Sequence, residues 1–244
     1  MDADYTAAYE RLYHSHWWWQ CREEYLLHVL RRHRVPVDAG VLDVGCGGGW
    51  AFPIWERFGD VRGVEIDPFL AQSNESTRER IHIGPLDRAF APGMSFGLIV
   101  MLDVLEHIDE PLPVLSRASE LLAESGQLLI TVPAHPSAWT HHDEVNHHRR
   151  RYTKRTLLEE VSGVGFELLE LRYFFHALVP LKWLVRCKES LLSPAASAPS
   201  VPGKTVNGLM GWFFRWEQRW VTPLGLPFGT SLMAVCKKKT TQAE

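Results

Sequence analysis

Short apolar runs alternate with amphipathic segments along most of the chain. Each run is bounded by glycine, proline or polar residues, which is typical of a buried β-strand. The expected strands cover residues 40–45, 60–67, 80–84, 96–105, 127–133, 166–175 and 229–239. The run at 96–105 is almost entirely apolar, as expected for a strand that is covered on both faces.

The segments between these runs place their apolar residues on one side of a helix. The expected helices cover residues 17–34, 50–59, 68–77, 111–126 and 153–165. Pro36 ends the first helix, Pro53 must lie in the first turn of the second, and Thr153 is the expected N-cap of the last. Strands that alternate with helices predict an α/β fold, a doubly wound parallel sheet with helices on both faces.

One long segment, residues 176–228, interrupts this alternation. It holds two amphipathic stretches, 176–192 and 208–221, joined by a Ser-, Pro- and Ala-rich stretch at 193–204 that is expected to be a flexible loop. The chain is therefore expected to have four parts, which are an N-terminal helical cap (1–36), a core (37–175), a helical aromatic insertion (176–228) and a closing strand with a C-terminal tail (229–244).

Composition narrows the class of protein. The 244 residues carry a net charge of -3, which argues against general affinity for DNA and disfavours RNA as a partner. Four cysteines lie far apart without a C-x-x-C pair, so neither a disulfide framework nor a cysteine zinc site is expected, and a reduced, cytoplasmic compartment fits best. The N-terminus lacks the pattern of a secretory signal, and no apolar run is long enough to span a membrane.

The stretch "VLDVGCGGGW" places three glycines, Gly45, Gly47 and Gly49, between an expected strand and an expected helix. Glycine allows a tight turn and a close approach of the backbone to a ligand. Glu65 ends the next strand, where a carboxylate can bind two ribose hydroxyls, so a nucleoside cofactor is implied. Trp50 stands where a dinucleotide site needs a sixth-place glycine, and Asp43 suits a ligand with an ammonium group.

The stretches "VLDVGCGGGW", "GVEIDP" and "LDVLEHI", in this order and spacing, resemble the class I methyltransferases that use S-adenosylmethionine. The resemblance covers roughly residues 40–172 and 229–239. It implies a Rossmann-like seven-stranded sheet in which strand 7 is antiparallel and inserted beside strand 5. It also implies S-adenosylmethionine as the cofactor.

The resemblance further implies which residues contact the cofactor. The glycine turn would line its methionine part, Glu65 its ribose and Ile66 its adenine, with the end of strand 4 beside the sulfonium. The implied contacts are Asp43, Gly45, Cys46, Gly47, Gly49, Glu65, Ile66, Leu86, Asp103 and Leu105. Leu86 stands where the family often has an Asp, and Gly97 replaces a second common Asp, so the backbone of Leu86 is the expected adenine contact.

The front of the chain resembles a subset of this family through His16, Trp17–Trp19 and Arg22. A segment before strand 1 can fold over the cofactor mouth, where Arg22 could pair with the methionine carboxylate. The alternative is that the tryptophans are core residues and that Arg22 is a surface charge.

The stretch "HHDEVNHHRRRY", residues 141–152, follows the fifth expected strand, at the edge of the sheet where ligands bind in this fold. The same subset has a similar segment. A metal site could use His142 and Asp143 with His147 or His148, but a sulfonium already activates the methyl group, so no metal is expected. A nucleic-acid contact could use the arginines at 149–151.

The third interpretation of this stretch is a substrate site. Histidine titrates near the working pH, so His148 or His107 is the candidate base that takes a proton from the acceptor. The remaining substrate candidates are Trp139, Asp143, Arg150, Arg151 and Tyr152, with the two arginines either as anion contacts or as partners of Asp143. The alternative is an ion-paired loop that braces a lid over the active site.

The insertion combines basic residues with Trp and Phe, a composition typical of helices that lie in a membrane interface. Alternatively it is a helical lid that walls the acceptor pocket, and both hold if the acceptor is a lipid or a polyprenyl-linked sugar. The sequence thus predicts methyl transfer from S-adenosylmethionine to a small or lipid-linked acceptor, at oxygen. Two alternatives stay open: an RNA methyltransferase and a catalytically silent, cofactor-binding regulatory or scaffold protein.

Overall fold

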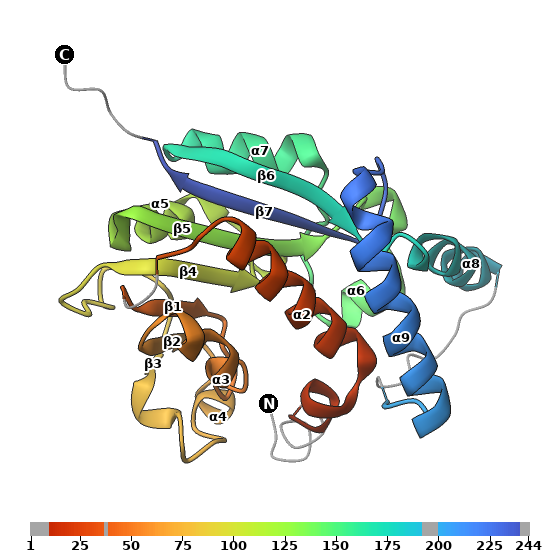
Figure 1. Cartoon of the computed structure of the whole chain (residues 1–244), viewed down its shortest axis with the longest axis horizontal. Coiled ribbons are helices and arrows are strands. Elements are labelled where there is room, and N and C mark those ends of the chain that lie inside the picture. Colours follow the sequence, from red (N-terminus) through yellow and green to blue (C-terminus); the bar gives the residue numbers. More distant parts are fainter. Residues whose placement is uncertain (1–9, 37–38, 192–199, 240–244) are drawn as a thin grey trace.

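The computed structural model describes residues 10–36, 39–191 and 200–239. Its core is one seven-stranded sheet with the strand order β3-β2-β1-β4-β5-β7-β6 (Figure 1). The strands are β1 Val41–Val44, β2 Val61–Glu65, β3 Ile81–Ile83, β4 Phe96–Leu102, β5 Leu122–Pro133, β6 Phe166–Phe174 and β7 Ser231–Lys238. β7 runs antiparallel to both β5 and β6, so the expected doubly wound sheet with an antiparallel strand 7 is confirmed.

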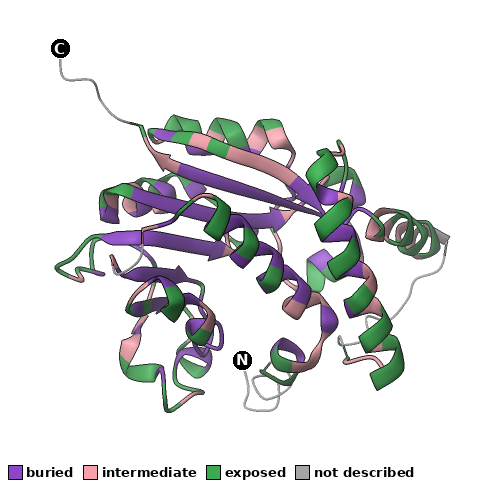
Figure 2. Ribbon diagram, in the orientation of Figure 1, coloured by how far each residue is buried: buried purple, intermediate pink, exposed green. Residues whose placement is uncertain are grey.

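Helices cover both faces of the sheet. They are α2 Trp17–Arg32, α3 Phe52–Trp55, α4 Pro68–Ala71, α5 Pro111–Leu121, α6 His141–Val145, α7 Lys154–Gly163, α8 Leu178–Leu191 and α9 Lys204–Trp220, with short 3-10 turns at Glu56–Phe58, Arg78–Arg80, Leu105–His107, Pro136–Ala138 and Thr222–Leu224. The strands are buried and most helices keep one exposed side (Figure 2). α2 begins after His16, whose imidazole accepts a hydrogen bond from the backbone of Trp18, and α7 begins after Thr153 as expected.

Two hydrophobic clusters lie on the two sides of the sheet. On one side α2 and α9 pack together, and the ring of Trp17 stacks on Phe214 with 4.6 Å between centroids. On the other side α5 and α7 bury Leu115 and Leu157. Apolar residues that recur every three or four positions in these helices therefore face the sheet, as the sequence pattern predicts.

Two of the expected helices end earlier in the structure than the sequence pattern predicts, so these two predicted ends are wrong. The helix expected at 111–126 ends at Leu121, because Leu122 pairs with Phe96 and so already belongs to β5. A Cβ atom on Gly126 would lie 2.8 Å from the carbonyl oxygen of Phe96, which shows how closely the two strands approach there. The helix expected at 68–77 ends at Ala71.

The insertion forms α8 and α9, beyond the carboxyl ends of the parallel strands (Figure 1). Much of the loop expected at 193–204 lies outside the described residues. The side chain of Asn207 on α9 bonds the backbone of Trp17 and Ser15, and so ties the insertion to the start of α2. Within the described ranges no helix has the length and apolar character needed to cross a membrane.

Candidate active site

The glycine turn after β1 has the backbone that only glycine adopts without strain. Gly45, Gly47 and Gly49 have φ angles of +71°, +56° and +70°. A Cβ atom on Gly45 would lie 2.6 Å from a side-chain methyl of Val104, which follows β4. The turn therefore lies close to the end of β4.

Glu65 closes the other side of this turn. Its carboxylate is buried at the end of β2 and accepts hydrogen bonds from the backbone N–H groups of Gly47 (2.8 Å) and Asp67 (2.9 Å). These two bonds fix the carboxylate while each oxygen keeps a lone pair for a further donor. Beside it, Ile66 is 72% exposed, an unusual position for an isoleucine next to a buried acid.

A second acid lies under the turn. Asp43 is buried in β1, and this burial raises its pKa to about 7. The thiol of Cys46 is also buried and lies 3.6 Å from the carbonyl oxygen of Gly47. The floor of the turn thus carries a buried acid, which suits a cationic ligand above it.

The N-terminal cap reaches this region. Arg22 is buried and forms an ion pair with Asp103, and its guanidinium lies 4.7 Å from the ring centroid of Trp18. Asp103 itself has a φ angle of +56°, which is uncommon for a residue other than glycine. Trp18 is half-buried against the hydrophobic core, and its ring also contacts the Arg22 guanidinium. That Arg22 binds the cofactor stays a prediction.

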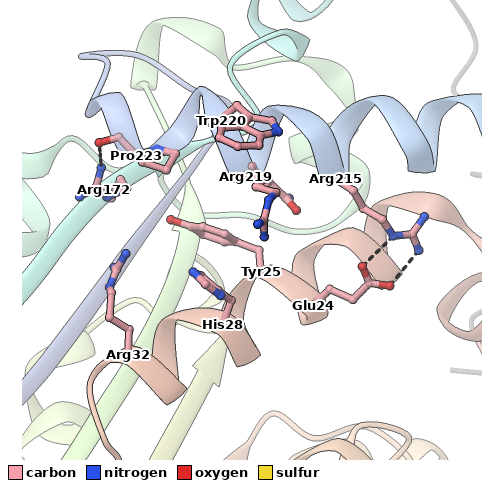
Figure 3. A pocket seen from close by; sticks show the side chains of 10 residues that line it. Glu24, Tyr25, His28, Arg32, Arg172, Arg215, Arg219, Trp220 and Pro223 are labelled. Atoms are coloured by element: carbon pink, nitrogen blue, oxygen red, sulfur yellow. Dashed lines mark hydrogen bonds and ion pairs between the residues drawn. The ribbon is translucent and has the colours of Figure 1, made fainter.

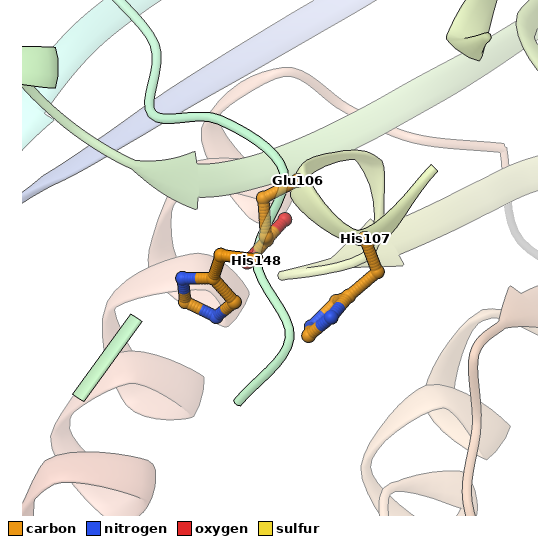
Figure 4. Close-up of side chains that lie close together, drawn as sticks. All are labelled: Glu106, His107 and His148. Carbon is orange, nitrogen blue, oxygen red and sulfur yellow. The ribbon is translucent and has the colours of Figure 1, made fainter. Parts of the chain in front are cut away.

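Three side chains meet just after β4. Glu106, His107 and His148 each bring a nitrogen or oxygen atom to within 4.8 Å of the others (Figure 4). The two imidazole rings lie edge to face, with 4.8 Å between centroids. Glu106 is fully buried, and its burial together with the nearby Asp103 raises its pKa well above the usual range. Desolvation and the neighbouring His148 lower the pKa of His107.

Asp143 orients one of these histidines. Its carboxylate is fully buried and accepts from His148 Nδ1 (2.8 Å), from Arg151 Nε (2.8 Å) and from the backbone of Thr140 (2.9 Å). Burial alone would raise the pKa of Asp143, but the bonds from His148 and Arg151 outweigh it and lower the pKa. Because Nδ1 of His148 is engaged, Nε2 is the ring nitrogen left to act on a ligand.

The donors weighed as an alternative metal site, His142 and Asp143 with His147 or His148, do not gather into one cluster in the described part of the chain. His142 Nε2 lies 3.1 Å from the side chain of Asn146, and the carboxylate of Asp143 is enclosed by the loop. Glu106, His107 and His148 are the donors that could hold an ion among the described residues. Sequence reasoning missed Glu106, although the Glu-His pair directly after an apolar strand was a usable signal.

The other candidates in this loop hold it in place. Arg150 donates to the carbonyl oxygens of Ile108 and Asp109, and Arg151 donates to that of Ala134 (2.9 Å). Tyr152 is buried, and its hydroxyl lies 3.4 Å from the carbonyl oxygen of Leu105. Of the two roles expected for Arg151, the pairing with Asp143 is confirmed. Arg150 also lies 3.7 Å from the carboxylate of Glu160, and its role as an anion contact stays a prediction.

Three further candidates lie at the rim or in the core. Trp139 is half-buried, and its carbonyl oxygen accepts from Arg186 of α8 (3.2 Å). The side chain of Leu86 is buried in the second core cluster, and that of Leu105 is completely buried at the start of the turn that carries Glu106 and His107. Leu86 can therefore meet a ligand only through its backbone.

The chain is similar in sequence to known methyltransferases. A family model described as a methyltransferase domain matches residues 17–171. A ubiquinone biosynthesis O-methyltransferase from Nitrosococcus oceani is 28% identical over 150 residues, and the match covers 54% of this chain and 62% of that protein. The chain thus aligns with about three fifths of that relative's length.

Solved structures share the fold. An S-adenosylmethionine-dependent methyltransferase from Clostridium acetobutylicum has a TM-score of 0.59 at 10% identity, covering 91% of this chain and 92% of its own. One from Archaeoglobus fulgidus has a TM-score of 0.55 at 17% identity, covering 88% and 94%. At these identities the likeness concerns the sheet and its helices alone.

Proposed function

The chain belongs to the methyltransferase domain family, and we propose that it methylates an oxygen atom of a small or lipid-linked acceptor held beside His107 and His148. Its activity class is that of an S-adenosylmethionine-dependent methyltransferase. The choice of this acceptor and of oxygen rests on one observation. The Asp143–His148 pair lies at the same edge of the sheet as the glycine turn.

The residues around the glycine turn fit the cofactor. The fixed carboxylate of Glu65 has lone pairs for two ribose hydroxyls, and the exposed Ile66 offers an apolar surface for a base. The positive φ angles of Gly45 and Gly47 form the tight turn above β1, and the buried Asp43 beneath it suits the positive charge of the ligand. When bound, S-adenosylmethionine supplies a methyl group on a good leaving group.

The chain's own contribution is to remove a proton and hold the acceptor. Asp143 fixes the His148 ring through Nδ1, so Nε2 can accept the hydroxyl proton as the oxygen attacks the methyl group. His107 lies beside His148 on the exposed side, and its lowered pKa keeps it neutral and able to share this role. Arg22 and Asp103 would bracket the methionine end, and the tryptophans of α2 would close the mouth.

Two features support an oxygen acceptor of modest polarity. The relative from Nitrosococcus oceani is named as an O-methyltransferase of ubiquinone biosynthesis. Arg150 donates to the carbonyl oxygen of Asp109 and Arg151 donates to Asp143, so both guanidinium groups are engaged and a strongly anionic acceptor or an RNA phosphate would find little there. α8 lies against this loop through Lys182, which donates to Thr140, and so forms one wall for the acceptor.

The test is product analysis with a deuterated methyl donor. The protein would be incubated with trideuteromethyl S-adenosylmethionine and a panel of phenols, catechols and polyprenyl phenols, and the products fragmented by mass spectrometry. We expect the label on an oxygen of one acceptor class. Label on carbon or nitrogen would contradict the proposal, and cofactor binding without product from any acceptor or extract would support the silent scaffold instead.

A further inference from the structure

α8 is a helix with its polar side turned inward. Lys182 donates to the hydroxyl of Thr140 (2.6 Å), Arg186 donates to the carbonyl oxygen of Trp139, and Glu189 accepts from the backbone of His141 (3.0 Å). These three residues recur at helical spacing on the side of α8 that faces the loop carrying His148. In a water-soluble surface helix this arrangement is reversed, because the apolar side packs inward.

The opposite side of α8 is apolar and open. Leu181, Leu184 and Val185 are exposed, with 56%, 67% and 40% of their surface accessible. These positions lie three or four residues apart and share the outward face with Lys188. Nothing in the described part of the chain covers this face.

α9 also turns large apolar residues outward, although its inner side is apolar too at Phe214. Its buried side is formed by Gly211, Phe214 and Gln218, which pack toward α2. Its outer side carries a stripe of large apolar residues at three- and four-residue spacing: Leu209, Trp212, Trp216 and Trp220, all of them exposed. Exposed tryptophans in a row are rare on the surface of a water-soluble monomer and mark an interaction site.

The charges of the insertion are unevenly distributed. Residues 176–228 hold six Lys or Arg and two Glu. Both acids point inward, since Glu189 binds the backbone of His141 and Glu217 binds the backbone of His176 and Ala177. Lys182 and Arg186 also face inward, and Arg215 pairs with Glu24 of α2. The outer surface of the insertion is therefore apolar and carries the positive charges of Lys188, Lys204 and Arg219.

A basic pocket adjoins the end of the tryptophan stripe. It is lined from α2 by His28 and Arg32 and from α9 by Arg215, Arg219 and Trp220 (Figure 3). Glu24 pairs with Arg215, and the Arg219 guanidinium lies 5.3 Å from the ring centroid of Trp220. Arg32 pairs with Glu170, so His28 and Arg219 are the basic residues of this pocket that an anionic group beside Trp220 could meet.

We propose that the outward faces of α8 and α9 bind the interface of an anionic lipid bilayer. The tryptophans would lie at the level of the headgroups, where an apolar ring with one polar edge is favoured, and Lys188 and Arg219 would meet lipid phosphates. Charge complementarity selects this occupant. A second copy of the chain would bring the same basic residues face to face, whereas an anionic surface neutralises them.

This surface is joined to the reaction site by α8 itself. The helix that turns leucines outward also holds Thr140 and Trp139 on its inner side, next to the loop that carries His148. An acceptor dissolved in the bilayer would therefore reach the site without crossing water. Binding to the bilayer does not depend on which acceptor is methylated.

The experiment is co-sedimentation of the full chain with vesicles, without cofactor or acceptor. The vesicles would contain phosphatidylcholine alone or phosphatidylcholine mixed with phosphatidylglycerol. We expect binding to the mixed vesicles, weakened by salt, and at least about a tenfold loss of binding in a Trp212→Ser/Trp216→Ser variant. The matched control is Leu112→Ser/Leu158→Ser, which removes two exposed apolar residues from α5 and α7.

Three outcomes would overturn the proposal. The chain could fail to sediment with either vesicle, or the tryptophan variant could bind as tightly as its control. The third is a dimer, seen by analytical ultracentrifugation, that the tryptophan variant loses while neither form binds vesicles. Circular dichroism should show that both variants keep the helical content of the wild type.

Discussion

The Nδ1 atom of His148 lies 2.8 Å from the Oδ1 atom of Asp143, a carboxylate with no exposed surface. A buried carboxylate that holds one imidazole nitrogen leaves the other in a fixed direction. Asp143 also receives Arg151 and the cap of α6, so one acid joins the loop to the sheet and orients the proposed base. The loop is thus both a brace and a candidate catalytic element, and the two interpretations of its sequence are compatible.

Replacing this acid should cost both stability and activity. In Asp143→Asn, Arg151 and Lys182 lose their buried counter-charge, so the free energy of unfolding should fall by about 3–5 kcal/mol. Urea unfolding would measure it. Glu144→Gln is the matched control, since Glu144 is exposed on the same helix and its change should stay within about 0.5 kcal/mol. An equal loss of unfolding free energy in the two variants would contradict this structural role of Asp143.

Arg22 should matter for the cofactor. Its guanidinium is buried beside the end of β4, where the carboxylate of the methionine part could accept two parallel hydrogen bonds. We expect Arg22→Ala to weaken S-adenosylmethionine binding by at least about tenfold in calorimetric titration, equal to about 1.4 kcal/mol. Arg31→Ala, on the same helix but exposed, should leave the dissociation constant as it is. If the dissociation constant is unchanged in Arg22→Ala, Arg22 does not bind the cofactor and its role is the ion pair with Asp103.

The glycine turn offers a comparison at equal backbone angle. Gly45 and Gly93 have φ angles of +71° and +70°, but a Cβ atom on Gly45 would meet Val104 whereas one on Gly93 would meet nothing within 4 Å. Gly93→Ala should cost about 1–2 kcal/mol from the left-handed backbone alone. Gly45→Ala should cost about 1–3 kcal/mol more, because the side chain of Val104 must move. Thermal unfolding of both variants measures the difference in stability. Similar losses of stability would contradict the close approach of Gly45 to the side chain of Val104.

The acid that holds α2 to the sheet should set part of the acid sensitivity. Burial alone would raise the pKa of Glu170, but hydrogen bonds from His33, Arg32 and Arg172 outweigh it and lower the pKa to about 2. The stabilisation is therefore present above pH 4.5 and is lost as the pH falls toward 2. Glu170→Gln should flatten this part of the stability profile, while Glu167→Gln, exposed on the same strand, should not. A parallel loss in both would contradict the role.

Much of the fold could be predicted because its signals are local. Apolar runs predict the strands that the structure has, and the glycine turn with Glu65 predicts the edge of the sheet at which the cofactor is expected. The end of α5 was missed because Leu122 is fixed by its pairing with Phe96, a contact that no local pattern reveals. The resemblance to a known family, rather than periodicity, indicated the antiparallel strand between β5 and β6.

The candidate site was only partly predictable, because its contacts join distant residues. The sequence offered His107 and His148 but not Glu106, which reaches them only when the turn after β4 meets the loop after β5. It gave Arg150 and Arg151 the same roles, yet the structure separates them: Arg151 binds Asp143 and Arg150 binds backbone carbonyls. The helical spacing of α8 was visible, but which side faces inward depends on Thr140 and its neighbours.

The role of His148 tests the account most directly. With a phenolic acceptor and cofactor both saturating, the single-turnover rate of methyl transfer would be measured for the wild type, His148→Ala and His141→Ala. The ring of His141 pairs with the exposed Glu144, so the His141→Ala variant is the matched control. We predict that His148→Ala lowers the rate by about 10²–10⁴-fold, that added imidazole partly restores it, and that His141→Ala is unaffected. A normal rate in a folded His148→Ala variant would contradict the proposed base.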